Sequence, residues 1–266
     1  MTIITPMLFR SFNPPLLGCV LWAMFTYLGS GASAQNAISS DEAEIVKRSE
    51  VASVLAREGD LDQAEKEYRA MIVDAESKLG SDKPTTVNLR ISLAVILRVK
   101  GKYEEAAKES RDLMRVVVRL VGPEHGATIL VWSNLARSLE GAGKFKEAGS
   151  IYDAILRVLN RAKGPEHPDT LKILASQASL LLAEGKDKDA DSELRRILPL
   201  MEKSLGKDHA STLAATATLA KCAMKQGRTS EAETLLKRAI EGAQKTLGAK
   251  HPETASYEAL LKEWHH

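Results

Sequence analysis

Apolar residues recur along this chain with helical spacing, in segments that end at glycines. Trp132, Leu135, Ala136 and Leu139 stand at i, i+3, i+4 and i+7, which places them on one face of a helix. Gly143 follows, and glycine accepts the left-handed backbone conformation that closes a helix. The next segment predicts a second helix that ends at Gly164 and carries on one face Ala148, Ile151, Tyr152, Ile155 and Leu159.

This two-helix pattern returns every 42 residues without insertion or deletion. Two glycine columns, two alanine columns and one threonine column keep the step. They are Gly59, Gly101, Gly143, Gly185 and Gly227; Gly80, Gly122, Gly164, Gly206 and Gly248; Ala52, Ala94, Ala136, Ala178 and Ala220; Ala64, Ala106, Ala148, Ala190 and Ala232; and Thr86, Thr128, Thr170, Thr212 and Thr254. A fixed period of this size indicates a solenoid of stacked helical units.

The small and hydroxyl-bearing columns have structural explanations. The alanines are expected where two helices cross closely, because a larger side chain would hold the backbones apart. The threonines stand just before each first helix, where a hydroxyl can accept a free backbone N–H, so they are predicted to be N-caps.

A further column, with the same step of 42 residues, consists of Lys83, His125, His167, His209 and His251. It therefore holds four of the chain's six histidines. Neighbouring units in a helical solenoid lie about 10 Å apart, whereas zinc ligands lie about 2 Å from one ion. Neighbouring histidines therefore cannot share a metal, and each is expected to bond backbone groups in its own loop. No metal site is predicted.

Composition agrees with a packed helical protein. Hydrophobic residues make up 44% of the chain and aromatic residues only 5%, with alanine and leucine dominant, which favours helices over sheet. The net charge is +2 and the two signs are mixed along the chain. Nucleic-acid binding needs a concentrated basic patch, so it is not expected.

The first 34 residues are expected to lie outside the fold. Residues 16–28 form a mostly apolar run, and Ala32-Ser33-Ala34 before Gln35 fits a small-x-small cleavage site, so residues 1–34 are predicted to be a secretory signal peptide. Residues 35–42 are predicted to be a linker, and the protein to be periplasmic or secreted. The alternative is an uncleaved membrane anchor formed by residues 16–34.

Removal of that segment leaves a single cysteine, Cys222. No intramolecular disulfide can then form, and the fold must be held by packing alone. Cys222 stands among apolar residues in a helical pattern, so it is expected to be a buried core thiol.

The unit from Trp132 to Tyr152 resembles a tetratricopeptide repeat, and the 42-residue period with linkers such as Gly164…His167-Pro168…Thr170 resembles the kinesin-light-chain-like subclass. The resemblance implies an all-α, right-handed superhelical solenoid over residues 43–266. Five helix pairs are then expected near 45–78, 87–120, 129–162, 171–204 and 213–246, with a capping helix near 253–264.

The same resemblance implies a non-enzymatic scaffold that holds a partner peptide in a concave groove lined by the first helix of each pair. Only Asn134 keeps the asparagine with which the kinesin-light-chain pattern holds a bound backbone; Ser92, Ser176 and Thr218 replace it elsewhere. Arg98, Arg137, Lys172 and Lys221 would make this face mildly basic, with Glu140 opposing them. The expected groove residues are Asn88, Ile91, Val95, Arg98, Leu130, Ser133, Asn134, Arg137, Lys172, Ala175, Ser179, Ala214, Ala217 and Lys221.

Catalysis and self-association are the two other functions that these residues could serve. Catalysis is not expected, because the chain has no Gly-rich phosphate loop, no HExxH, no G-x-S-x-G and no CxxC. No cofactor is predicted either. Self-association through the alanine-rich first helices remains the alternative to binding another protein.

Overall fold

The computed structural model describes residues 39–249 and 251–264. Within these residues the chain folds into α-helices joined by short loops, which confirms the all-α prediction. The helices are α2 (Ser40–Glu58), α3 (Leu61–Lys78), α4 (Pro84–Val99), α5 (Tyr103–Val121), α6 (Gly126–Gly141), α7 (Phe145–Ala162), α8 (Pro168–Ala183), α9 (Asp187–Ser204), α10 (Ala210–Lys225), α11 (Thr229–Thr246) and α12 (Pro252–Trp264).

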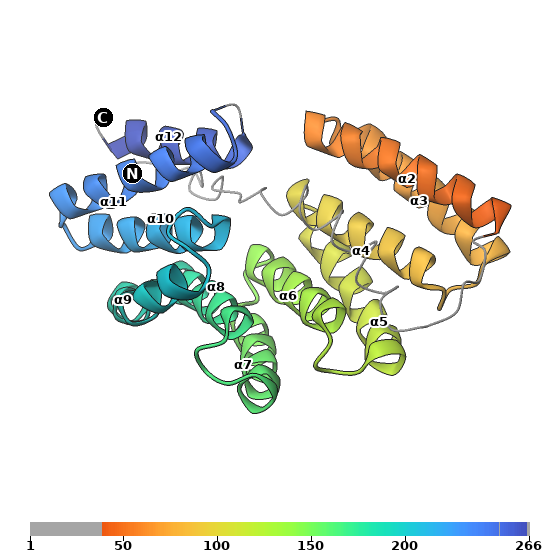
Figure 1. The fold of residues 1–266 in the computed structure, drawn as a ribbon, viewed down its shortest axis with the longest axis horizontal. Helices are drawn as coiled ribbons and strands as arrows, with labels where there is room; N and C mark the ends of the chain where they lie inside the picture. The colour runs from red at the N-terminus through yellow and green to blue at the C-terminus, as the bar shows by residue number, and fades with distance from the viewer. Residues whose placement is uncertain (1–38, 250, 265–266) are drawn as a thin grey trace, which may run out of the picture. The chain divides into compact units, whose positions relative to one another are not determined.

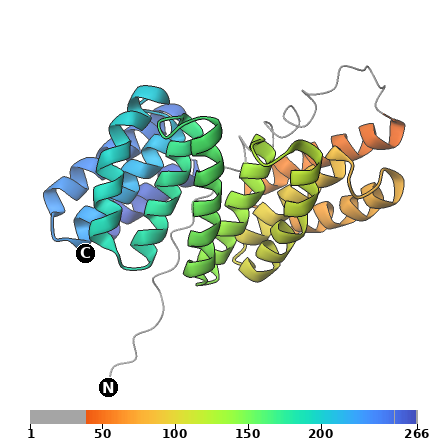
Figure 2. The ribbon, with the colours of Figure 1, turned by 90° about the horizontal axis from the view of Figure 1, so that it is seen from below.

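The described residues divide into two compact units. The N-terminal unit, residues 39–165, contains α2 to α7, and the C-terminal unit, from residue 166 onward, contains α8 to α12. In each unit a helix packs along the one that follows it in the chain (Figures 1 and 2). The first helices of neighbouring pairs also pack on one another: α2 on α4, α4 on α6, and α8 on α10. Both units therefore have the sequential packing of a repeat solenoid.

The helices end at the glycines of the two columns. The described glycines of both columns have positive φ, and Gly80 shows why that matters: at φ 95° its N–H donates to the carbonyl of Ala75 across 3.1 Å. That bond satisfies one of the carbonyls that the end of α3 leaves without a helical partner. A side chain with a Cβ rarely adopts this conformation.

Histidines, rather than threonines, cap α6, α8, α10 and α12. The Nδ1 atoms of His125 and His167 accept the backbone N–H of Ala127 and Asp169 across 3.2 and 3.1 Å. His209 and His251 accept in the same way from Ser211 and Glu253, at 3.1 and 3.2 Å. The expectation that each histidine bonds the backbone of its own loop is thus confirmed.

The prediction of threonine caps is wrong. Thr86, Thr128 and Thr254 donate their hydroxyl hydrogens to the carbonyls of Gly80, Gly122 and Gly248 at 2.8, 2.6 and 2.9 Å. These buried threonines lie inside the first helical turn, where the hydroxyl reaches back across the loop. Each one ties the start of a first helix to the glycine that closes the preceding helix.

The N-terminal boundary differs from the expected one. α2 begins at Ser40, inside the segment 35–42 that was expected to be a linker. Ser39 caps the helix by accepting the backbone N–H of Glu42 at 3.1 Å, and the acidic Asp41 and Glu42 favour the positive end of the helix dipole. Residues 1–34, which the sequence predicts to be a signal peptide, lie outside the described residues.

Alanine and leucine fill the interior. Every member of the two alanine columns is buried, as their predicted place at close helix crossings requires. Cys222 is buried in a cluster with Leu219 and Leu194, which confirms the predicted core thiol, and burial raises its pKa to about 11. None of the described helices combines the length and apolar character needed to cross a bilayer.

α12 covers the apolar end of the C-terminal unit. It packs on α11, and its Tyr257 is buried in a cluster with Leu213 and Leu236. Leu260, Leu261 and Trp264 lie partly buried against the same cluster. This is the capping helix that the sequence predicts, since the last repeat of a solenoid otherwise exposes an apolar face.

Candidate protein-binding surface

The first helices form one layer of each unit, which we call the inner layer: α2, α4 and α6 in the N-terminal unit, and α8 and α10 in the C-terminal unit. The second helices form the outer layer. The first helices can pack closely on one another because small buried residues, such as Ala94 and Ala136, lie where these helices meet.

The structure separates the predicted groove residues into two groups. Lys172, Ala175, Ser179, Ala214, Ala217 and Lys221 belong to α8 and α10 of the C-terminal unit, and the remaining eight belong to α4 and α6 of the N-terminal unit. The half-buried members of this second group are Asn88, Leu130, Ser133 and Arg137.

Several predicted groove residues are buried instead of lining a surface. Ile91 packs in a core cluster with Val87, Leu113 and Val131, and Val95 belongs to the neighbouring cluster. Asn134 is also buried. Their spacing in the sequence predicts that they share a helix face with polar residues. Because α4 and α6 pack closely against each other, these side chains are buried instead.

Two arginines of the inner layer, Arg98 and Arg137, lie near enough to influence each other's charge, each toward the C-terminal end of its helix. Arg98 of α4 is only 5% exposed, and its Nε atom has no hydrogen-bond partner. Burial, and next the positive charge of Arg137 on α6, lowers the pKa of Arg98 to about 10. Arg98 therefore stays charged at neutral pH, although it is almost fully removed from water.

Glu140 and two tyrosines complete this group, which we call the inner cluster: Arg98, Tyr103, Arg137, Glu140 and Tyr152. Burial raises the pKa of Glu140, while Arg137 and Arg98 lower it by less. Tyr152 of α7 is buried, its hydroxyl makes no hydrogen bond of normal geometry, and burial raises its pKa. The tyrosines were not predicted as site residues, because their spacing marks them only as apolar positions.

Tyr103 owes its position to a glycine. A Cβ on Gly141 would lie 2.5 Å from Cδ1 of the Tyr103 ring, so only glycine lets the ring lie against the end of α6. Burial raises the pKa of Tyr103 as well. The contact holds the beginning of α5 against α6, next to the cluster's charged residues.

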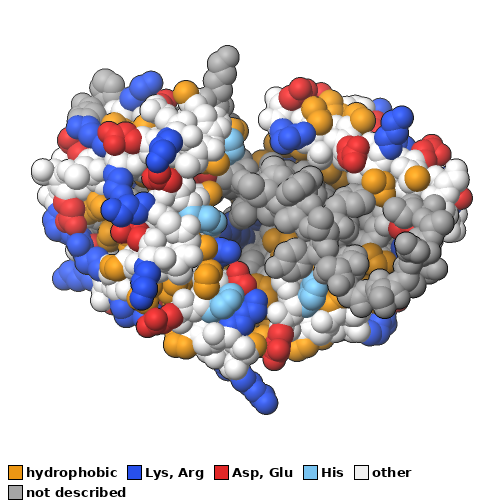
Figure 3. Space-filling view, viewed as in Figure 1, with side chains coloured by type: hydrophobic (Ala, Val, Ile, Leu, Met, Phe, Trp, Pro, Cys, Tyr) orange, Lys and Arg blue, Asp and Glu red, His pale blue; other side chains and the backbone are white. Residues whose placement is uncertain are grey.

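In the C-terminal unit, each of the two inner-layer lysines has an acidic side chain nearby. Lys172 lies 3.2 Å from the Asp169 carboxylate on its own helix. Burial lowers the pKa of Lys221 on α10, and Glu263 of α12 is the largest influence that raises it. Both lysines thus have an acidic group of the same unit nearby. On the face seen in Figure 3, side chains of both charges are interspersed over the C-terminal unit.

Among residues 39–249 and 251–264 no three histidine, cysteine or acidic side chains gather closely enough to hold a metal ion. The histidines of the column instead use their Nδ1 atoms to accept hydrogen bonds from their own helices.

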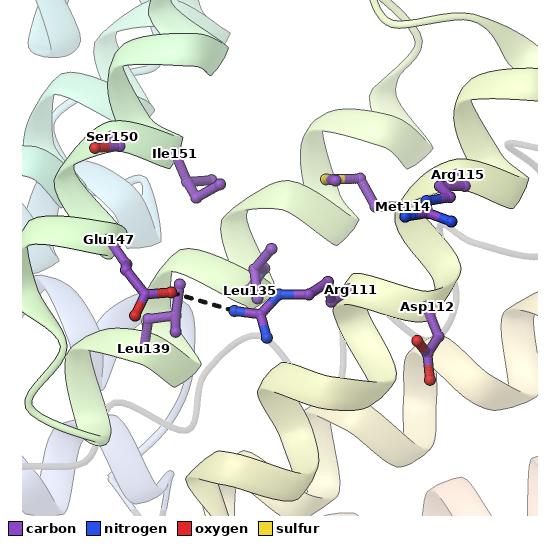
Figure 4. A pocket seen from close by; sticks show the side chains of 9 residues that line it. All are labelled: Arg111, Asp112, Met114, Arg115, Leu135, Leu139, Glu147, Ser150 and Ile151. Atoms are coloured by element: carbon purple, nitrogen blue, oxygen red, sulfur yellow. Dashed lines mark hydrogen bonds and ion pairs between the residues drawn. The ribbon is translucent and has the colours of Figure 1, made fainter.

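A cleft of about 550 Å³ opens between α5 and α7 on the outer layer, with Leu135 and Leu139 of α6 at its floor (Figure 4). Arg111 and Glu147 face each other across it at 3.3 Å. Arg69 pairs with Glu105 in the same way, at 2.8 Å. Arg195 and Glu231 form a third pair of this kind. Because this pairing recurs between successive outer helices, we interpret it as a structural feature of the repeat.

The profile of the tetratricopeptide repeat family matches three overlapping stretches, residues 127–203, 177–241 and 212–266. This chain belongs to the tetratricopeptide repeat family. Together with the helix pairs, the match confirms the resemblance drawn from the 42-residue period. No curated protein is similar to the chain in sequence.

Solved structures share the fold at low identity. A Podosopora anserina protein described as a kinesin light chain with nearly identical TPR-like repeats is 22% identical, with a TM-score of 0.60 over 77% of this chain and 96% of its own. BtubC (BKLC) from P. vanneervenii is 18% identical, with a TM-score of 0.60 over 89% and 94%. PlcR from Bacillus thuringiensis, in complex with the peptide PapR7 and DNA, is 16% identical, with a TM-score of 0.58 over 85% and 76%.

Proposed function

We propose that this tetratricopeptide repeat protein is an exported, non-catalytic scaffold that holds a segment of another protein against its inner layer. The observation that carries the proposal is the inner cluster, in which the Arg98 guanidinium is almost fully buried beside Arg137 and its Nε atom has no hydrogen-bond partner. The half-buried Arg137 and Glu140 bring the charge of this cluster to the edge of the inner layer, where it can attract a charged partner.

Two further features support this function. Extended concave layers are the surfaces that repeat solenoids use for binding. One structural neighbour, PlcR, was solved with a bound peptide. No motif for a chemical step accompanies the inner cluster, so its groups are assigned to recognition.

Export rests on the N-terminal sequence. The apolar run of residues 16–28, followed by Ala32-Ser33-Ala34, supports cleavage before Gln35 and action in the periplasm or outside the cell. Expression of the full chain in its own host, followed by fractionation and mass spectrometry of the mature N-terminus, tests this. A chain that begins at Gln35 in an extracytoplasmic fraction is expected, and an intact N-terminus in the cytoplasm would refute export.

Blocking the inner layer by bulk tests the binding surface. Ser133 is half-buried on the same face of α6 as Arg137, so Ser133→Trp would fill the space in front of it. Ser150→Trp, at the rim of the outer cleft, is the matched control. Affinity capture from the host's extracytoplasmic extract is expected to lose its partner with Ser133→Trp and keep it with Ser150→Trp. Equal recovery by both variants would exclude the inner layer, and recovery of the chain alone would favour self-association.

A further inference from the structure

We propose that the outward face of α2 is a dimerisation surface, on which a second copy of this chain packs with its own α2 antiparallel to the first. This goes beyond the scaffold function proposed above and does not rest on it. The inference begins with the place of α2, which packs on α3 and α4 at one end of the N-terminal unit (Figure 1). The side of α2 that faces away from both helices is exposed to solvent.

Two large apolar side chains lie on this outward face. Val51 and Val54 are 59% and 39% exposed. They stand three residues apart, so their side chains are neighbours on the helix surface. A terminal helix of a solenoid keeps a polar outer face where it meets water. α2 departs from that rule near its middle, and an occupant that covers the two valines would account for the departure.

The residues around the two valines have the spacing of a coiled coil. Steps of four and three residues along α2 connect six exposed positions, which we call the α2 seam: Ser40, Glu44, Lys47, Val51, Val54 and Glu58. Two helices that pack side by side meet along such a stripe. Glu50 and Arg57 are also exposed and flank the seam on one side, one heptad apart. The geometry therefore suits a partner helix.

Charge complementarity favours a second α2 as that helix. In an antiparallel pair with its two-fold axis between the valines, Val51 of one copy meets Val54 of the other. Lys47, four residues before Val51, then meets Glu58, four residues after Val54. Glu50 and Arg57 of opposite copies come together beside the seam. Each contact occurs twice by symmetry, so pairs of opposite charge surround an apolar centre.

The charges that such a dimer would use have no ion-pair partner in their own chain among the described residues. They are Lys47, Glu50, Arg57 and Glu58. The charges of α2 that face α3 are paired instead: Arg48 lies 2.6 Å from Asp74, and Asp41 lies 3.2 Å from Lys78. A second copy would supply the missing partners.

The contact is small, and this sets the expected strength of the dimer. One helix from each copy buries less surface than a standard protein interface, so dissociation in the micromolar range is expected. Ion pairs at the rim of the contact remain open to solvent and are screened by salt. The dimer should therefore weaken as the salt concentration rises.

Sedimentation velocity of the whole chain, purified from its host, tests the dimer across the micromolar range. A monomer–dimer equilibrium is expected. Val51→Glu should weaken dimerisation by about tenfold or more, because it places a carboxylate at the apolar centre of the contact. Val73→Glu, at an exposed position of α3, is the matched control and should dimerise like the wild type. Circular dichroism checks that both variants are folded.

Charge reversals then decide whether the copies meet antiparallel. Lys47→Glu and Glu58→Lys each bring like charges together in the dimer, and each should weaken it by about tenfold. A mixture of the two variants should form a heterodimer of near wild-type affinity, because each copy supplies the charge that the other needs. The double variant should recover affinity for the same reason. Lys66→Glu, at an exposed position of α3, is the control.

A chain that stays monomeric across this range, or a dimer of unchanged affinity in Val51→Glu, would overturn the proposal. So would a mixture and a double variant that recover no affinity. The face would then belong to another protein. The scaffold function is tested separately, because Ser133 and Ser150 lie on α6 and α7. Loss of the partner with Ser133→Trp in a monomeric chain would support that function and refute only the dimer.

Discussion

The Nδ1 atom of His167 accepts the backbone N–H of Asp169 across 3.1 Å, at the start of α8. The same bond recurs at His125, His209 and His251. An imidazole can accept at Nδ1 only when that nitrogen carries no proton. A protonated histidine would also place a positive charge at the positive end of a helix dipole. A cap of this kind is therefore made by a neutral imidazole.

Acidification should weaken the caps that His209 and His251 form. Burial, helped by the positive charge of Lys172, lowers the pKa of His209, and burial lowers that of His251. The unfolded chain takes up protons near the usual pKa of 6.5, while the folded chain resists them. The stabilisation is thus present above about pH 6.5 and is lost as the pH falls through the lowered folded-state pKa values.

The double variant His209→Asn and His251→Asn isolates this effect, since asparagine caps helices without titrating. Urea unfolding at pH 8 and pH 5 should show a smaller acid-induced loss in the variant, by about 1 kcal/mol. Stability at pH 8 should stay close to that of the wild type. An identical pH dependence in both proteins would mean that other groups govern the acid response.

Removal of the Glu65 carboxylate should lower the free energy of unfolding more than removal of most other carboxylates near the surface. It is 6% exposed and accepts hydrogen bonds from Lys100 at 2.6 Å, Lys102 at 2.9 Å and Arg69 at 2.9 Å. Burial raises its pKa, but these three partners outweigh that effect and lower it to about 2. The carboxylate joins α3 to the turn between α4 and α5.

Glu65→Gln is expected to lower the free energy of unfolding at pH 7 by about 2 kcal/mol, because a neutral amide binds the three partly exposed cations less well than the carboxylate does. Glu105→Gln, which removes only the exposed partner of Arg69, should cost less than about 1 kcal/mol. Since the folded pKa of Glu65 is lowered, its contribution persists above the usual value of 4.5 and disappears as the pH falls toward about 2. Equal losses in chemical denaturation of the two variants would contradict this.

Gly141→Ala should disturb the inner cluster through Tyr103. The new Cβ would lie 2.5 Å from the ring, so the tyrosine or the start of α5 must shift, at a cost of about 1–3 kcal/mol. In a double-mutant cycle with Tyr103→Leu, the smaller and more flexible side chain should recover part of that loss. Strictly additive losses in the two substitutions would show that Tyr103 is not the source of the strain.

The sequence supports prediction of the repeat more fully than prediction of the site. The 42-residue step and the apolar spacing were enough to place helix pairs and buried alanines, because each repeat solves the same packing problem. The capping role was harder to assign, since His125 and Thr128 lie three residues apart and both can bond a backbone group. Which one caps depends on where the chain leaves the extended conformation, and His125 has φ −71° and ψ 143°.

The inner cluster could be foreseen only in part. Spacing put Arg98 and Arg137 on one face, but the depth of Arg98 depends on how α4 packs against α6, and on buried residues such as Tyr152 of α7. Ile91 shares that spacing and yet belongs to the core. The difference between a polar residue that faces solvent and one that is buried arises from contacts between elements far apart in the chain, which a periodic pattern does not encode.

Shortening the Tyr257 side chain, which anchors the capping helix α12, should destabilise the C-terminal unit. It should also promote association between copies of the chain. Tyr257 is buried against Leu213 and Leu236, and its hydroxyl donates to Glu253 at 2.9 Å. Tyr257→Ala should cost about 3 kcal/mol and loosen α12, uncovering the apolar end of the last helix pair. Lys262→Ala, at an exposed position of the same helix, should change the free energy of unfolding by less than about 0.5 kcal/mol. Light scattering over a range of concentrations should show larger species for Tyr257→Ala alone, and a monodisperse variant that unfolds like the wild type would show that α12 does not protect this end.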